Sequence, residues 1–263
     1  MTIEEMREHE WIVSWSGGKD STATIILMHE NNIPIKEIIY VRMMYDENLP
    51  ATLPVMTDFV DNSKKIFEDW GYKVTIVPSI RSAKDISEKR FYRSKYAERN
   101  GKKYGLSNFS RGRCKMTGAK TDTIAKLVKE RDPDAYEMIG YAADETKRIH
   151  RLSERKQSIM VELGIKEKDT FDICRKYNLL SPLYDLGISR DGCFFCPNAK
   201  KLEREYIHEH YPELVKKIYK LIEEMDYKCS ELPNNWLKDY TDHGNKFTPA
   251  QIGRSDIEDK DSH

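Results

Sequence analysis

Short apolar runs alternate with stretches of helical periodicity along the first 150 residues of the chain. The run from Trp11 to Trp15 is typical of a short buried strand. Three more strands are predicted at 33–44, 74–77 and 136–141. Helices are predicted at 23–28, 58–70 and 118–131, where apolar residues recur at helical spacing. Strands that alternate with helices predict right-handed crossovers, and therefore an α/β fold with a doubly wound parallel sheet.

The chain beyond this alternating region has a different pattern. Apolar positions at Leu152, Ile159 and Val161 indicate one further helix. After residue 200, two helices divided at Pro212 predict a mostly helical C-terminal extension. We therefore expect three parts: an α/β domain at 1–165 with an insertion at 84–120, a cysteine-containing helical subdomain at 166–253, and a disordered polar tail at 254–263.

The hexapeptide from Ser16 to Ser21, with the sequence Ser-Gly-Gly-Lys-Asp-Ser, joins the first strand to its helix. Gly17 and Gly18 let the backbone approach an anion closely, and the first N–H groups and the dipole of the helix attract negative charge. Ser16 and Ser21 add hydroxyl groups, and Lys19 adds a positive charge. The stretch therefore predicts a phosphate site at Ser16, Gly17, Gly18, Lys19, Asp20 and Ser21. The alternative is an ordinary turn in which Asp20 or Ser21 caps the helix.

Composition indicates more about where the protein works than about what it does. The 263 residues include 44 basic and 44 acidic side chains, so net charge indicates no class of partner. No apolar run approaches the roughly 20 residues that cross a bilayer, and the first residues contain no secretory signal, so we expect a cytoplasmic protein without a membrane partner. Five unevenly spaced cysteines favour metal binding or reactive thiols over a disulfide framework.

Charge is distributed unevenly in one segment. Residues 84–120 hold twelve basic and three acidic side chains, with five aromatic residues interleaved. Such a basic patch fits a phosphate-rich partner, and its aromatic rings suit base stacking, so a nucleic-acid acceptor or partner is one interpretation. A solvated helical insertion whose aromatic residues face the core is the other.

Two further segments contain side chains suited to catalysis or metal binding. The sequence from Gly140 to Arg148 follows the fourth strand and holds Asp144 and Glu145, which suit a site for Mg²⁺-bound phosphates but could equally cap the next helix. Cys193 and Cys196 form a CxxC pair, which chelates a soft metal or a cluster when further ligands join it. A redox dithiol is the rival interpretation, although no thioredoxin-like context surrounds this pair.

These segments together resemble one enzyme family. The hexapeptide resembles the SGGxDS signature of the PP-loop ATP pyrophosphatases, and the stretch from Gly140 to Arg148 resembles the GxRxDESxxR motif of their PAPS reductase branch. The segment from 181 to 198 resembles the NPLYDxGxxRxGCxxCP segment of related PP-loop proteins, including some that act in DNA phosphorothioation. The stretch from Arg111 to Lys120 resembles the RxCx₄K motif of the family, although Lys120 lies one position further from Cys114 than in that motif. Ala142 stands where the family has Arg.

The resemblance implies ATP or PAPS as the nucleotide. Lys19 and the loop amides would stabilise the leaving pyrophosphate, and Asp20 with Asp144 or Glu145 would hold Mg²⁺. Gly140 and Arg148 would contact the nucleotide.

The resemblance also implies a [4Fe–4S] cluster held by Cys114, Cys193 and Cys196. Zinc is the alternative, and it would need Cys229 as a fourth ligand. Cys174 lies in a helical pattern and fits the core, not a metal site.

Three functions follow from these expectations. The first is an enzyme that adenylates an acceptor with release of pyrophosphate and then transfers sulfur, through the cluster or a cysteine persulfide, from a sulfur donor that the sequence does not identify. The second is a reductase of phosphoadenosine phosphosulfate or adenylyl sulfate, although no cysteine follows Cys229 to serve as the C-terminal nucleophile of such enzymes. The third is a non-catalytic nucleotide-binding subunit of a nucleic-acid modification system.

Overall fold

The computed structural model of the protein describes residues 1–90, 92–93, 100–103, 114–223, 236 and 239–240. The chain forms two compact units, each assembled from separate segments of the sequence. The first unit consists of Met1–Met43, Thr52–Ile80 and Lys120–Asp191. The second consists of Met44–Ala51, Arg81–Ala119 and Gly192–His263.

The first unit is built on a five-stranded sheet in which all pairs are parallel. Its strands are β1 (Trp11–Trp15), β2 (Ile35–Arg42), β3 (Val74–Pro78), β4 (Tyr136–Met138) and β5 (Lys156–Gln157). Their order is β3-β2-β1-β4-β5, so the chain moves outward from β1 in one direction and then returns to the other side of it. The predicted α/β fold with a doubly wound parallel sheet is confirmed.

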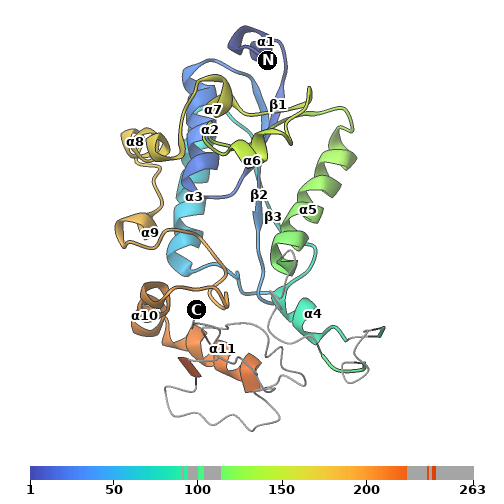
Figure 1. Ribbon diagram of the computed structural model, residues 1–263, viewed down its shortest axis with the longest axis vertical. Helices are drawn as coiled ribbons and strands as arrows, with labels where there is room; N and C mark the ends of the chain where they lie inside the picture. Colours follow the sequence, from blue (N-terminus) through green and yellow to red (C-terminus); the bar gives the residue numbers. More distant parts are fainter. Residues whose placement is uncertain (91, 94–99, 104–113, 224–235, 237–238, 241–263) are drawn as a thin grey trace, which may run out of the picture. The chain divides into compact units, whose positions relative to one another are not determined.

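Helices cover both faces of this sheet. Helices α2 (Lys19–Glu30) and α3 (Pro54–Asp69) lie on one side, and α5 (Lys115–Arg131) lies on the other (Figure 1). Nearly every residue of α2 from Lys19 to Met28 is buried. Such a helix must be covered on several sides, and α2 packs against β1, α7 (Ile159–Glu162) and α8 (Thr170–Lys176). Trp11, Val13 and Trp15 of β1 complete this core.

The remaining elements of the first unit are short. They are α1 (Ile3–Arg7), α6 (Thr146–Ile149), the 3-10 helix η2 (Glu167–Asp169) and α9 (Pro182–Asp185). The unit therefore continues past residue 165, because α8 and η2 pack on each other and α8 packs on α2. The division into domains at 1–165 and 166–253 remains a prediction.

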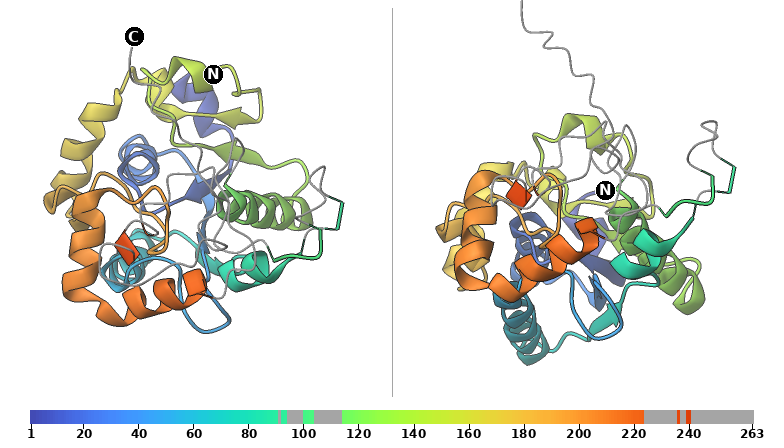
Figure 2. Two further views of the ribbon diagram at one scale, coloured as in Figure 1. Left: turned by 60° about the horizontal axis from the view of Figure 1, so that its bottom comes forward. Right: turned by 90° about the horizontal axis from the view of Figure 1, so that it is seen from below.

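The second unit contains α4 (Ala83–Glu88), α10 (Lys201–His210) and α11 (Pro212–Glu223). Helices α10 and α11 meet at an angle at Pro212, the first residue of α11, as the sequence predicts (Figure 2). The mostly helical character expected of the C-terminal part is thus present in its described residues. No helix in the described ranges has the length and apolar content of a membrane span.

One sequence-based prediction differs from the structure, and another is not tested by it. Leu152, Ile159 and Val161 do not share one helix: α6 ends at Ile149, β5 follows, and only Ile159 and Val161 lie in α7. The interruption arises because Lys156 pairs in register with Glu137 of β4, which draws the chain into the sheet. The predicted disordered tail at 254–263 lies outside the described residues.

Candidate nucleotide site and cysteine turn

Sheet register brings the two nucleotide motifs of the first unit together. Val13 of β1 pairs with Met138 of β4, so the residues just after β4 are level with the end of β1. Gly140 lies there, and a Cβ added to it would lie 2.9 Å from both the Cα and the N of Ser21. Only a glycine fits this approach without displacing backbone. The contact lies between β1 and β4, where the strand order reverses, which is where doubly wound sheets bind ligands.

The loop itself is tightly closed. Gly17 has a φ of +80°, and a Cβ there would meet Val60, Met56 and Tyr40 at 3.4 to 3.6 Å. The Ser16 and Ser21 hydroxyl oxygens lie 2.8 Å apart. The Ser16 hydroxyl also accepts from the Gly18 N–H at 3.3 Å, and the Ser21 hydroxyl donates to the Gly18 carbonyl at 3.0 Å. Both serines therefore stabilise the loop, in addition to any contact with an anion.

The start of helix α2 has no side-chain cap. Its N-cap residue is Gly18, so neither Asp20 nor Ser21 caps the helix as an ordinary turn would require. The first N–H bonded in the helical pattern is that of Thr22, which donates to Gly18 O at 3.1 Å. The amides of the preceding turn have no carbonyl partner within the helix, but those of Gly18 and Lys19 donate to the hydroxyls of Ser16 and Tyr184, which an anion at this helix start would have to replace. The Lys19 N–H lies 3.4 Å from the Tyr184 hydroxyl oxygen.

Lys19 does not extend into solvent. Its ammonium lies 2.7 Å from Asp20 Oδ1 and 2.9 Å from Glu167 Oε1, and only 6% of its side chain is exposed. Burial lowers the pKa of Lys19, but the hydrogen bonds and charges of Asp20 and Glu167 outweigh burial and hold this pKa above its ordinary value. Thr170 donates to Asp20 Oδ1 at 3.0 Å. Lys19 therefore links α2 to η2 as a charged group.

Asp144 and Glu145 occupy different surroundings. Asp144 Oδ1 accepts the backbone N–H of Glu167 at 3.0 Å, which connects it to Lys19 through Glu167. Glu145 accepts the N–H of Ala142 at 3.2 Å and pairs with Arg148 at 2.6 Å. Each carboxylate keeps a further oxygen or lone pair for another ligand. Their roles in metal binding remain predictions.

Arg148 packs against Tyr141, with its guanidinium carbon 4.3 Å from the ring centroid. Burial lowers the pKa of Arg148, but the Glu145 carboxylate outweighs it and raises this pKa. Ala142, which replaces the family arginine, is fully buried. Within the segment 140–148, these contacts therefore hold the Arg148 guanidinium in place.

Sequence reasoning missed three residues of this site. Glu167, Thr170 and Tyr184 contact Lys19 or Asp20 from about 150 positions further along the chain. No local pattern marks them, although Tyr184 lies inside a segment that the sequence did single out. Cys174 is confirmed as a core residue: it is fully buried and its thiol donates to the Lys19 carbonyl at 3.2 Å. Burial, with the nearby Asp20 charge, raises the pKa of Cys174 to about 12.

The CxxC pair lies in the second unit on a tight turn. The N–H of Cys196 donates to the carbonyl of Cys193 at 2.8 Å, and Phe194 N–H donates to Ala51 O at 2.8 Å. Cys196 is buried and Cys193 is half-buried. The pair places two thiols on one short turn, as the sequence predicts.

A complete metal site is not assembled by the described residues. Cys114 belongs to the same unit, yet within the described ranges no three Cys, His, Asp or Glu side chains gather closely enough to hold a metal ion. The described residues therefore do not fit a [4Fe–4S] cluster or zinc on their own. Cys229, the predicted fourth ligand, lies outside the described residues. The ligand set of Cys114, Cys193 and Cys196 remains a prediction.

Basic residues from two separate parts of the sequence line the same cavity as Cys114. Cys114 is half-buried beside this cavity of about 310 Å³, which Arg81, Lys89 and Lys115 also line. Arg81 and Lys89 flank helix α4, about 30 residues earlier in the chain. Arg111 and Arg113 of the predicted motif lie outside the described residues. Lys120 belongs to the first unit, where its ammonium lies 5.9 Å from the centroid of the Tyr40 ring.

Comparison with known proteins gives little further guidance. No protein-family model and no curated protein sequence matches the chain. Among solved structures, the chain is similar to the U34-tRNA thiolase NcsA from Methanococcus maripaludis, determined with its [4Fe–4S] cluster. The match has a TM-score of 0.44 and 14% sequence identity, and covers 96% of this chain and 85% of that one. Similarity at this level assigns no activity to this chain.

Proposed function

We propose that this chain is an ATP-using enzyme of the PP-loop type. It binds an adenine nucleotide at Ser16–Ser21, transfers the adenylyl group to an oxygen of an acceptor, and releases pyrophosphate. The observation that carries this proposal is the approach of Gly140 to the backbone of Asp20 and Ser21. Two motifs more than 100 residues apart meet at the switch point of the sheet, at a helix N-terminus without a side-chain cap.

The chemistry of the proposed step follows from this geometry. The acceptor oxygen attacks the α-phosphorus, the bond to the bridging oxygen breaks, and the β- and γ-phosphates leave as pyrophosphate. Negative charge increases on the leaving group, where the loop amides and the dipole of α2 stabilise it. Lys19 contributes from its charged state, since its raised pKa keeps it protonated at neutral pH.

Magnesium fits this arrangement as a partner of the nucleotide. Mg²⁺ is usually held by one or two carboxylates together with substrate phosphates, so a three-carboxylate cluster is not required. Asp20 and Asp144 are the carboxylates that the loop and the Gly140 segment provide. When bound, the ion would neutralise phosphate charge and so favour attack at phosphorus.

Sulfur transfer is the second half of the proposal. We assign this step to Cys193 and Cys196. A persulfide formed on one of them from a sulfane-sulfur donor attacks the activated carbon and displaces AMP. The other thiol then attacks the inner sulfur, which releases the thiolated acceptor and leaves a disulfide for an external dithiol to reduce. Within the described ranges no three cluster ligands gather, so the proposal gives the sulfur-carrying role to these two thiols. Whole-protein iron and sulfide analysis after anaerobic purification tests the cluster separately, and broad absorbance near about 400 nm would reveal it.

The test of the proposal is exchange of radiolabelled pyrophosphate into ATP, measured with the full chain and candidate acceptors. Exchange that Gly140→Ala abolishes and Gly118→Ala preserves supports the proposal. Gly118 is a matched control, because a Cβ there meets nothing within 4 Å. Exchange that Gly140→Ala leaves unchanged contradicts the proposal. Formation of sulfite from phosphoadenosine phosphosulfate with thioredoxin would instead assign the reductase activity.

A further inference from the structure

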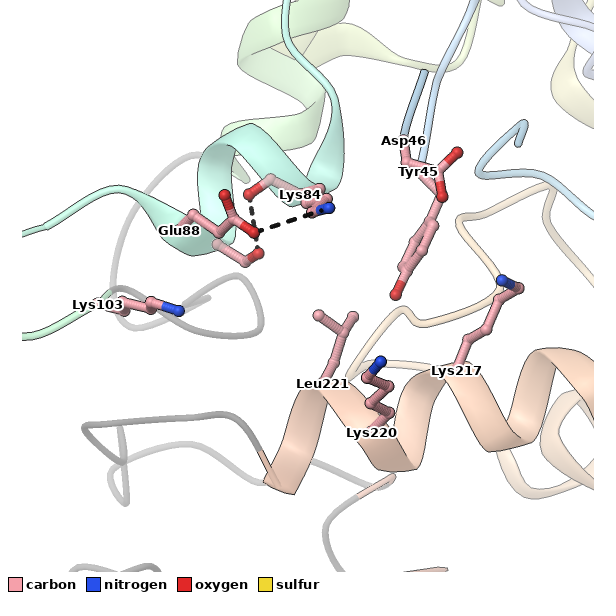
Figure 3. Close-up of a pocket in the computed structure, with 9 residues that line it drawn as sticks. Tyr45, Asp46, Lys84, Glu88, Lys103, Lys217, Lys220 and Leu221 are labelled. Atoms are coloured by element: carbon pink, nitrogen blue, oxygen red, sulfur yellow. Dashed lines mark hydrogen bonds and ion pairs between the residues drawn. The ribbon is translucent and has the colours of Figure 1, made fainter. Parts of the chain in front are cut away.

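The second unit contains a cavity of about 580 Å³ to which the nucleotide loop does not contribute (Figure 3). Its walls come from the segment after β2, from α4, from the chain near Lys103 and from α11. Four lysines line it together with two carboxylates: Lys84, Lys103, Lys217 and Lys220, with Asp46 and Glu88. Lys84 and Lys103 belong to the basic segment 84–120 that the sequence analysis identified. The two lysines of α11 lie outside that segment.

Lysines predominate in the lining of this cavity. Among its described lining residues, four are lysines and two are carboxylates, and Lys103 and Lys220 each have a further interaction. Asp46 also uses Oδ1 to accept the N–H groups of Asn48 at 3.0 Å and Leu49 at 2.9 Å, so part of its charge is bound to its own turn. Glu88 lies 4.0 Å from Lys84. An anionic ligand would complement the lysines of this lining.

The helical pattern of α11 explains why two of its lysines line the cavity. Leu214, Val215, Ile218 and Ile222 form the buried face of this helix. Lys217, Lys220 and Leu221 are spaced three and four residues apart along one edge of that face, and Figure 3 shows all three side chains on the side of α11 that lines the cavity. Lys216 is exposed and is not among the lining residues. Lysine stems at such an edge cover apolar surface while the charged ends reach the open space.

Tyr45 connects this cavity to the cysteine turn. Its ring packs against Phe194 and Phe195, at centroid distances of 5.2 and 5.6 Å, and these are the two residues between Cys193 and Cys196. Its carbonyl accepts the N–H of Lys84 at 2.9 Å, which fixes the start of α4. In Figure 3 the Tyr45 hydroxyl points toward α11. One aromatic side chain therefore contributes to the cavity wall and also packs against the CxxC turn.

We propose that this cavity is a second anion site, which binds a phosphate group of the acceptor beside the cysteine turn. The ligand chemistry is a phosphate ester, from either a phosphorylated small molecule or a nucleic-acid strand. A lining in which lysines outnumber carboxylates suits a phosphate group, and the cavity volume suits a ligand of nucleotide size. The identification of the ligand as the acceptor rests on the proposed function; the binding of phosphate does not.

The test measures binding by the full chain, with and without saturating Mg²⁺ and α,β-methylene-ATP. The probes are inorganic phosphate, a 5′-phosphorylated RNA 12-mer and the same 12-mer without its terminal phosphate. Lys217→Glu is compared with Lys216→Glu, because both substitutions change the net charge equally on the same helix. We expect Lys217→Glu to weaken binding of at least one probe tenfold or more, and Lys216→Glu to change it less than twofold.

Each outcome decides the proposal or the source of the phosphate. Equal effects of the two substitutions indicate general charge attraction and overturn the proposal, as does binding that neither substitution changes. If Lys217→Glu weakens the binding of inorganic phosphate, or of the phosphorylated oligomer but not of the unphosphorylated one, the result supports a terminal phosphate ester as the ligand. If Lys217→Glu weakens the binding of both oligomers, the result supports a nucleic-acid backbone as the ligand. The salt dependence of oligomer binding should then be smaller for Lys217→Gln than for the wild-type protein. If the chain binds no ATP while these effects persist, the proposed function fails and the anion site stands.

Discussion

Lys19 and Glu167 are 148 positions apart in the sequence, yet the Lys19 ammonium lies 2.9 Å from the Glu167 carboxylate. Asp20 approaches the same ammonium at 2.7 Å. The one lysine of the nucleotide loop is thus neutralised by two carboxylates in this structure. A phosphate group that contacts Lys19 has to compete with Glu167, which belongs to a surface 3-10 helix with 60% of its side chain exposed.

Glu167→Gln should therefore tighten ATP binding. The substitution removes a negative charge that competes for Lys19, and because Glu167 itself is largely exposed we expect a change of about threefold in affinity. Calorimetric titration with Mg²⁺ and ATP measures the change. Glu162→Gln, at another exposed glutamate of the same unit, should have no effect. Weaker binding in Glu167→Gln would show that Glu167 helps to hold the nucleotide or its metal ion.

The same ion pairs predict a pH dependence. Because the folded pKa of Lys19 is raised, the stability that its charge contributes is fully present below its ordinary pKa of 10.5 and is lost as pH rises through the folded value. Thermal unfolding of the wild-type protein and Lys19→Met at pH 8 and pH 11 tests this sign. The difference between the two proteins should shrink at the higher pH. A difference that grows with pH would contradict the assignment of Lys19 as a charged group.

Gly140→Ala should displace the loop without unfolding the sheet. The added Cβ would lie 2.9 Å from backbone atoms of Ser21, so the start of α2 has to move. We expect at least tenfold weaker ATP binding and a lowered melting temperature. Gly118→Ala, inside α5, should instead raise stability by up to about 1 kcal/mol, because alanine is the better helix former. Unchanged ATP affinity in Gly140→Ala would remove the main support for the proposed function.

The described cysteines should differ sharply in reactivity. With a pKa of about 12, Cys174 has roughly one thiolate in 10⁴ molecules at pH 8. Cys114 and Cys193 are half-buried and should react with iodoacetamide first in the native protein. Mass spectrometry of peptides after timed labelling gives the order. Modification of Cys174 as early as Cys193 would mean that α8 separates readily from α2.

Glu37 gives a prediction for acid stability. This buried carboxylate of β2 contacts Arg131, Thr75 and Lys73, and these partners outweigh its burial and lower its pKa. The stability that it contributes is complete above its ordinary pKa of 4.5 and is lost as pH falls through the lowered folded value. Removing Arg131 would leave a buried charge without its main partner, at a cost of about 2 to 3 kcal/mol.

Urea unfolding of Arg131→Ala at pH 7 and pH 3.5 tests this account. The loss of stability should be large at pH 7 and smaller at pH 3.5, where protonation of Glu37 removes the buried charge. Arg155→Ala is the control, because its partner Asp134 is exposed and its loss should change stability little. Equal losses for the two variants at pH 7 would show that Glu37 is better solvated than its burial indicates.

The sequence predicted the sheet well where apolar runs were long. The predicted runs at 11–15 and 33–44 contain strands β1 and β2, because buried parallel strands contain nearly continuous apolar residues. Strand β5 was missed, since its two residues, Lys156 and Gln157, have no apolar pattern and form a strand only by pairing with β4. Local pattern therefore predicts the centre of the sheet but not its short edge.

The candidate site was only partly predictable, for a similar reason. Ser16–Ser21 and Gly140 have local signals, namely glycines at strand ends before helices. Glu167 stands between Lys166 and Lys168, a context that is typical of a solvated surface, and only packing of α8 on α2 brings it to Lys19. A contact that depends on tertiary structure leaves no trace in the spacing of residues.

The most direct test of the central claim is hydrogen–deuterium exchange of the full chain with and without Mg²⁺ and α,β-methylene-ATP, read by mass spectrometry. The account predicts slower exchange of the amides in peptides that cover 16–22 and 139–145, because the nucleotide phosphates bind the N–H groups at the start of α2. Slower exchange confined to peptides of α4 and α11, or no protection at saturating nucleotide, would contradict it.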